Sequence, residues 1–128
     1  MKNKYLLDTN IVIYYFNGIT SDENIFEILK YSFNISIITK IEFLSWQRLH
    51  EDKSLAGKAS DFISYATIYE LDELVANQTI RIRQQRKIKT PDAIIAATAM
   101  VHGFEVVTNN VDDFKNLDIK VTTIKLQC

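Results

Sequence analysis

The sequence is poor in the residues that cross-link or break a chain. Its 128 residues include one cysteine, one proline and three glycines. Cys128 has no partner for an internal disulfide, which is typical of a reducing compartment. No apolar run approaches the roughly 20 residues of a membrane-spanning helix, and the apolar stretch near the N-terminus is too short for a signal peptide. We therefore expect a cytoplasmic protein with no membrane segment.

A strong net charge is also absent. Lys and Arg number 15 and Asp and Glu number 16, which gives a formal net charge of −1. This balance excludes a generally basic nucleic-acid binder, so any contact with RNA or DNA must use a local patch. With 47% hydrophobic and 24% charged residues, the composition is that of a globular protein. The length is sufficient for one core, and we expect a single domain over residues 1–128.

The only proline marks the start of a helix. Thr90 fits the N-cap and Pro91 the first helical position, where a missing N–H costs no hydrogen bond. Asp92 then lies in the first turn, and Gly103 is a good C-terminal residue. The run between them carries no charge, so the helix can pack on nearly all sides. An acid at this place either compensates the helix dipole or has a chemical role.

Elsewhere, short apolar runs alternate with helical spacing. The expected strands are 5–7, 35–38, 69–71, 105–108 and 120–124. The other expected helices are 11–16 with a cap at Asp8 or Asn10, 21–31 opened by Ser21, 39–49 opened by a Thr39–Glu42 capping box, 58–68 after a polar turn, 72–87, and a brief one before Phe114. This alternation is typical of an α/β protein with a mostly parallel sheet covered by helices on both faces. Function in such folds gathers beyond the carboxyl ends of the strands.

Four carboxylates follow these strands, namely Asp8, Glu42, Asp92 and Asp113, with Asp112 beside the last. Parallel neighbouring strands would bring three of the four to one edge. Converging carboxylates repel one another, and burying them without a partner is costly. A divalent cation removes that cost, and oxygen ligands without nearby His or Cys favour Mg²⁺ or Mn²⁺ over zinc. Such an ion can orient water and stabilise the charge on a phosphodiester.

Each of these acids also has a structural interpretation. Asp8 could be an N-cap, Glu42 could complete its capping box, Asp92 could offset the helix dipole, and Asp113 could complete a box with Asn110. Taken singly, each acid is more often a cap than a ligand. Capping does not require all of these acids to follow strands, so their joint placement favours a shared chemical role. The two roles are compatible, since a fixed cap is a preorganised ligand.

Four stretches resemble the PIN domain family, and within it the small VapC-like toxins of type II toxin–antitoxin pairs. They occur in the family's order over almost the whole chain, and the third is the most specific. They are Tyr5-Leu6-Leu7-Asp8-Thr9-Asn10-Ile11, Ile38-Thr39-Lys40-Ile41-Glu42-Phe43, Thr90-Pro91-Asp92-Ala93-Ile94-Ile95-Ala96-Ala97-Thr98-Ala99, and Thr108-Asn109-Asn110-Val111-Asp112-Asp113-Phe114.

The resemblance implies a three-layer α/β/α sandwich and a metal-dependent endoribonuclease. It implies that Asp8, Glu42, Asp92 and Asp113 are the catalytic acids and hold Mg²⁺ or Mn²⁺, with Thr9 and Asn110 as supporting residues. It further implies an RNA substrate, a homodimer and a cognate antitoxin that inserts a segment into the site.

The chain departs from the family pattern at two positions. The pattern Asn-x-x-Asp-Phe selects Asp113, but Asp112 is also acidic and could share or replace its role. Position 109, often basic in relatives, is Asn109, which leaves a possible phosphate contact open.

One dense positive run precedes Asp92. Its members that we consider for RNA binding are Arg83, Arg86, Lys87 and Lys89. A positive surface beside an acidic metal site suits an RNA backbone. A solvated helix face, or a surface for an acidic antitoxin, would explain any one of them equally well.

Two other functions compete with a ribonuclease toxin. One is a phosphotransfer domain of the haloacid dehalogenase type, in which an aspartate after the first strand is a nucleophile. That class expects a second acid two residues later, where this chain has Asn10. The other is a catalytically silent PIN-like module that keeps the acids as caps and acts by binding.

Overall fold

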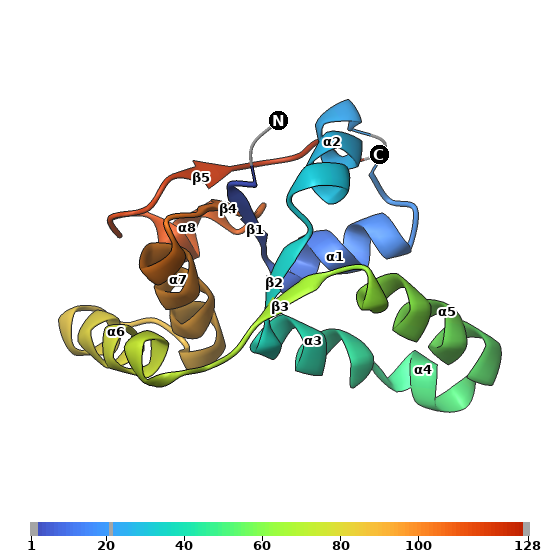
Figure 1. Ribbon diagram of the computed structural model, residues 1–128, viewed down its shortest axis with the longest axis horizontal. Helices are drawn as coiled ribbons and strands as arrows, with labels where there is room; N and C mark the ends of the chain where they lie inside the picture. The colour runs from blue at the N-terminus through green and yellow to red at the C-terminus, as the bar shows by residue number, and fades with distance from the viewer. Residues whose placement is uncertain (1–2, 21, 127–128) are drawn as a thin grey trace.

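The structure is a computed structural model that describes residues 3–20 and 22–126. Short strands alternate with helices along these residues (Figure 1). The strands are β1 (Tyr5–Leu7), β2 (Asn34–Ser36), β3 (Thr67–Tyr69), β4 (Glu105–Val107) and β5 (Val121–Thr122). The helices are α1 (Thr9–Phe16), α2 (Glu23–Tyr31), α3 (Ile37–Leu44), α4 (Gln47–Glu51), α5 (Lys53–Ser64), α6 (Glu73–Gln85), α7 (Thr90–His102) and α8 (Val111–Phe114).

Every strand pairing among the described residues is parallel. One ladder has the order β1-β4-β5, and β2 pairs with β3 in a second ladder. The two ladders meet where β2 runs beside β1. At this junction Asn34 Nδ2 donates a hydrogen bond to the carbonyl oxygen of Tyr5 at 2.8 Å. The predicted parallel arrangement is confirmed, and the carboxyl ends of the strands share one edge of the sheet.

Helices cover both faces of the sheet, as predicted for a three-layer α/β/α sandwich. Alternate strand residues point to opposite faces. Leu6 and Val106 belong to one core with α6, α7 and α8, whereas Leu7 and Val107 belong to a second core with α1, α2 and α5. Figure 1 shows these two groups of helices on either side of the strands. β1 and β4 are thus covered on both faces, which explains their consecutive apolar residues.

The start of α3 differs from the prediction. Ser36, the last residue of β2, is the N-cap, and its Oγ accepts a hydrogen bond from the backbone N–H of Ile38 at 3.1 Å. Thr39 therefore lies inside the helix and the predicted Thr39–Glu42 capping box does not form. β2 pairs with β3 only as far as Ser36, so the chain turns into the helix before the apolar run ends.

The start of α7 is shifted by one residue from the prediction. Lys89 is the N-cap, Thr90 is already helical, and Pro91 follows it. Proline is still tolerated there, because the first four backbone N–H groups of a helix have no intrahelical partner. The predicted end is confirmed, since Gly103 caps the helix with a left-handed φ of 73°. Asp92 remains in the first turn.

The region between α3 and β3 was predicted least well. The helix expected over 39–49 is divided into α3 and α4, and the turn expected over 50–57 contains the end of α4 and the start of α5. Asp52 caps α5 through a hydrogen bond from the N–H of Leu55 at 3.1 Å. Ser21, the expected start of the second helix, lies outside the described residues, and Asp22 caps α2. No helix in ranges 3–20 and 22–126 is long and apolar enough to cross a membrane.

Candidate active site

Asp8 lies at the carboxyl end of β1 and caps α1. Its Oδ1 accepts from the backbone N–H of Thr9 at 2.8 Å, and its Oδ2 accepts from the hydroxyl of Thr108 at 2.7 Å. Only 3% of the residue is exposed. Burial raises the pKa of Asp8, the two hydrogen bonds lower it in part, and the charges of Glu42 and Asp113 raise it further. Asp8 is thus both the predicted cap and a buried acid among other acids.

Glu42 comes from α3 and is tied to α1. The hydroxyl of Thr9 donates to Glu42 Oε1 at 2.6 Å and lies 3.0 Å from the hydroxyl of Thr39. Thr9 thus contacts one of the acids, at the position where the resemblance implies a supporting residue. Because the capping box is absent, helix capping does not account for Glu42. The side chain is instead held toward the carboxyl end of β1.

Asp92 is a half-buried acid that lies among the other three acids. Burial raises the pKa of Asp92 to about 6, with further increases from the charges of Asp8, Asp113 and Glu42. The positive charge of Lys89 lowers the pKa of Asp92 in part. Electrostatic interactions of this strength require short separations. The four predicted acids therefore share one region, although they come from four different helices or helix starts.

The structure distinguishes Asp113 from Asp112. The charge of Asp113 acts on both Asp8 and Asp92. The side chain of Asp112 is 91% exposed and forms an ion pair with Lys115 at 3.5 Å. Asn110 makes no side-chain cap, so the alternative capping box with Asp113 does not form; its backbone N–H donates to the hydroxyl of Thr108 at 2.9 Å. The geometry favours Asp113 as the fourth member of the cluster.

The donor set suits a hard divalent cation, but the acids are not gathered into a closed ligand group. No three Asp, Glu, His or Cys side chains in the described part of the chain are close enough to hold a metal ion together. Mg²⁺ usually keeps several waters and takes only one or two carboxylates directly. Burial, and after it the repulsion among the acids, raises the pKa values of Asp8 and Asp92, and a bound cation would offset both effects. These residues fit a largely hydrated ion.

The predicted basic run lies beside the acids. A cleft of about 470 Å³ joins the end of α6 and the start of α7 to α8. Its charged lining residues are Arg83, Arg86, Lys87, Lys89, Asp92, Asp112 and Asp113. Cations thus form one wall of the acidic site, as a phosphate-binding surface would require.

The sequence did not indicate that Thr108 contacts Asp8 or that Thr39 contacts Thr9. Thr108 is fully buried and links Asp8 to the N–H of Asn110. A polar residue directly after a buried strand is the signal that could have identified it. The open question at Asn109 has a structural answer, because its Oδ1 accepts from the N–H of Ile124 at 3.0 Å and so holds the segment after β5.

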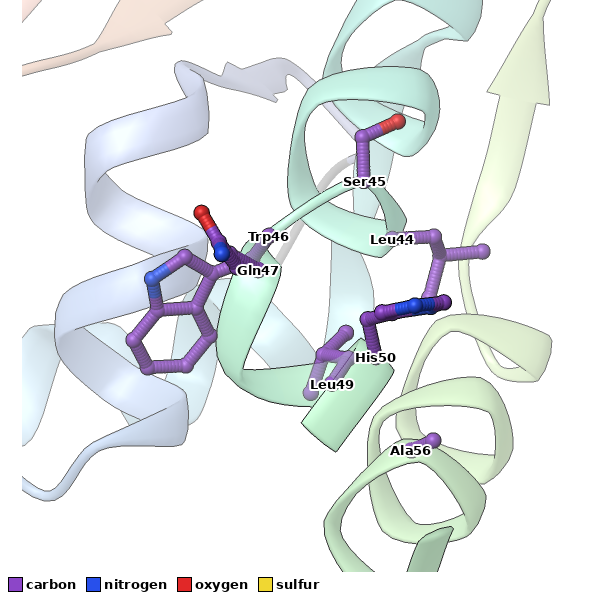
Figure 2. A pocket seen from close by; sticks show the side chains of 7 residues that line it. All are labelled: Leu44, Ser45, Trp46, Gln47, Leu49, His50 and Ala56. Carbon is purple, nitrogen blue, oxygen red and sulfur yellow. The ribbon is translucent and has the colours of Figure 1, made fainter. Parts of the chain in front are cut away.

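A second hollow, of about 530 Å³, lies at the end of α3 and contains no acid (Figure 2). It is lined by Leu44, Ser45, Trp46, Gln47, Leu49, His50 and Ala56. In Figure 2, Trp46 and Gln47 lie on one side of α4, with Leu44 and His50 on the other. The guanidinium of Arg48 is 5.1 Å from the centre of the Trp46 ring. Nothing in this lining resembles catalytic machinery.

The family model of the PIN domain matches residues 5–120, which include all four acids. The chain belongs to the PIN domain family. No curated protein matches the chain significantly. Nothing in the match itself assigns roles to individual residues of this PIN domain.

Solved structures similar to this PIN domain include toxin–antitoxin complexes. A toxin–antitoxin complex from Klebsiella pneumoniae is 30% identical, with a TM-score of 0.75 over 93% of this chain and 96% of the other. DNA-bound VapBC from Salmonella typhimurium is 26% identical, with a TM-score of 0.77 over 96% and 98% of the two chains. VapBC2 from Rickettsia felis, bound to a promoter DNA fragment, has a TM-score of 0.81 over 94% and 98% at 23% identity, which supports the fold alone.

Proposed function

We propose that this PIN domain is a metal-dependent endoribonuclease that acts as the toxin of a toxin–antitoxin pair. The observation that carries the proposal is the coupling of Asp8, Glu42, Asp92 and Asp113 at one sheet edge. Thr9 contacts both Asp8 and Glu42, Asp92 and Asp113 line one cleft, and the charges of the other acids add to the effect of burial in raising the pKa values of Asp8 and Asp92. The similarity to VapBC structures supports the toxin assignment. A general acidic site does not select among tRNA, rRNA and mRNA.

The residues of the chain would prepare this site before any substrate arrives. The hydroxyl of Thr108 and the N–H of Thr9 hold the two oxygens of Asp8, and the Thr9 hydroxyl holds Glu42. A bound Mg²⁺ or Mn²⁺ would supply charge stabilisation at the phosphodiester and orient a water. Because the acids are already held in place, they would position the cation without any rearrangement of their side chains.

The basic wall would bind the RNA backbone next to the acids. Lys87 and Lys89 are exposed on the acidic cleft. Contacts of this kind are independent of base sequence and weaken as salt displaces them. We therefore expect the affinity for RNA to fall steeply with ionic strength even in the absence of a divalent cation.

We also propose an antitoxin partner and a homodimer. The similar Klebsiella pneumoniae and Salmonella typhimurium structures are complexes of toxin with antitoxin. Apolar side chains left exposed on α6, Leu74 at 67% and Ile80 at 53%, support self-association. Light scattering of the purified protein tests the dimer. Copurification with the product of the adjacent reading frame tests the antitoxin.

RNA cleavage by the purified protein tests the enzymatic proposal. We expect cleavage with Mg²⁺ or Mn²⁺, none after chelation, and a loss of orders of magnitude in Asp8→Asn. Asp61→Asn on α5, an exposed acid outside the cluster, is the matched control and should cut at the wild-type rate. Equal cleavage by wild type and Asp8→Asn would refute the proposal.

A catalytically silent binding module is the second candidate. It is favoured by the absence, in the described ranges, of three acids within reach of one metal ion. This candidate predicts RNA binding that is indifferent to Mg²⁺ and to Asp8→Asn, with no cleavage. The haloacid-dehalogenase alternative has no support, because the chain belongs to the PIN family.

A further inference from the structure

Arg86 differs from Lys87 and Lys89 in how its side chain is held, and from Arg83, whose Nε donates to the nearby Ile88 carbonyl oxygen at 3.3 Å, in how far along the chain it reaches. It lies at the C-cap of α6, where its backbone is extended and its N–H donates to the carbonyl oxygen of Ile82. Its Nη1 donates to the carbonyl oxygen of Lys115, 29 residues away. Its Nε is buried and has no partner within the described residues. The guanidinium therefore reaches across from the end of α6 to the end of α8.

The acceptor of this hydrogen bond is the C-cap residue of the helix that carries Asp113. α8 has only four residues, and a helix of that length is not stable without tertiary contacts. The carbonyl of Lys115 lies past the last helical residue, where helical carbonyls lack intrahelical partners. A charged donor stabilises such a carbonyl. Apart from Arg86, α8 is held mainly by Phe114, which is 1% exposed in the core.

Lys87 and Lys89 have a different environment. Both residues are exposed, and neither side chain forms a hydrogen bond or ion pair within residues 3–20 and 22–126. Both line the same cleft as Asp92 and Asp113. The ammonium groups of Lys87 and Lys89 therefore keep all their donors for phosphates. Arg86 lines the same cleft, but it already uses one donor on the Lys115 carbonyl, and its Nε is buried.

We propose that Arg86 is a positioning residue for Asp113, which it serves by fixing α8 through the Lys115 carbonyl, and that it is not an RNA contact. This separates Arg86, a structural cation, from Lys87 and Lys89, the substrate-binding cations, although the sequence presents them as one group. The role assigned to Asp113 rests on the proposed ribonuclease function. The link between Arg86 and α8 does not.

Hydrogen exchange of the metal-free protein tests the link without any activity. In Arg86→Gln we expect residues 111–117 to exchange about tenfold faster, as loss of one hydrogen bond from a charged donor implies. The buried core of α7 should exchange as in wild type. Arg86→Lys keeps one charged donor and should restore part of the protection, which also guards against a general folding defect. Unchanged exchange in residues 111–117 of Arg86→Gln would overturn the proposal.

RNA binding and turnover separate the two kinds of cation. Lys87→Gln is the matched control at the next position: it should reduce the slope of log affinity against log salt by about 0.7, the value for one phosphate contact on a single strand, and raise KM. Arg86→Gln should keep the wild-type salt slope and lower kcat, with partial rescue by Arg86→Lys. A reduced slope in Arg86→Gln would overturn the proposal. If wild type neither binds nor cuts RNA, the ribonuclease function fails, and the exchange measurement still decides the role of Arg86.

Discussion

The hydroxyl of Thr108 donates to Asp8 Oδ2 at 2.7 Å, although the two residues are 100 positions apart in the sequence. β1 and β4 pair in parallel, with Leu7 opposite Val107, so the residues that follow them meet at the same edge. The bond stabilises the charged form of Asp8 against the effect of burial. Thr108 therefore makes a buried acid tolerable at this position.

Replacement of Thr108 by valine tests this relationship. Thr108→Val should raise the pKa of Asp8 further and lower the free energy of unfolding by about 1–3 kcal/mol at neutral pH, the cost of an unsatisfied buried polar group. The loss should shrink in acid, where Asp8 is neutral in both variants. Urea unfolding at two pH values measures it. Thr108→Ser keeps the hydroxyl and serves as the control; equal losses in the serine and valine variants would contradict the role of the hydrogen bond.

Thr9 offers a second test, because it connects two acids. Its backbone N–H holds Asp8 and its hydroxyl holds Glu42. Thr9→Val keeps the first bond and removes the second, so RNA cleavage should fall by about 10- to 100-fold, as for other residues that orient metal ligands. Thr9→Ser should retain most of the rate. A valine variant with wild-type activity would show that Glu42 needs no such support.

Asp92 should affect stability and activity in opposite directions. Its folded pKa of about 6 exceeds its ordinary value of 3.8. Between these values the folded protein binds more protons than the unfolded chain, so the free energy of unfolding falls as pH rises through this window. Asp92→Asn removes this contribution. We expect the variant to be more stable than wild type at about pH 7.5, with the difference lost near pH 4.

The same substitution should reduce RNA cleavage by about 100-fold or more, since it removes preorganised charge from the site. Thermal unfolding of the metal-free proteins across the pH range measures the effect on stability. A single-turnover cleavage assay measures the effect on activity. A variant that is less stable than wild type at neutral pH would contradict the repulsion among the acids. A variant that cuts normally would exclude Asp92 from the site.

Much of the fold and the acidic cluster could be predicted from local signals. Asp8 follows a short apolar run and caps the next helix, and Pro91 places Asp92 in a first turn. Both signals depend on residues that are close in sequence, so they can be recognised in a single sequence. The parallel order of the strands then brought distant acids together, as general rules for α/β folds imply.

The errors arose where tertiary contacts decide between two local patterns. Thr39 and Glu42 have the spacing of a capping box, but β2 ends at Ser36 and this residue caps α3 instead. The polar residues 50–57 predict a turn, yet residues 53–57 lie inside α5, where Asp52 supplies the cap. The hydrogen bond from Thr108 to Asp8 and the bond from Arg86 to Lys115 join segments whose proximity no local pattern shows.

The most direct test of the central claim is a calorimetric titration of the metal-free protein with Mn²⁺. We expect saturable binding to wild type that is abolished in Asp8→Asn and weakened in Asp92→Asn, because the two acids share one charged region. Asp61→Asn should bind like wild type. No binding heat in wild type, or equal binding in wild type and Asp8→Asn, would contradict the assignment of these acids to a metal-dependent nuclease site.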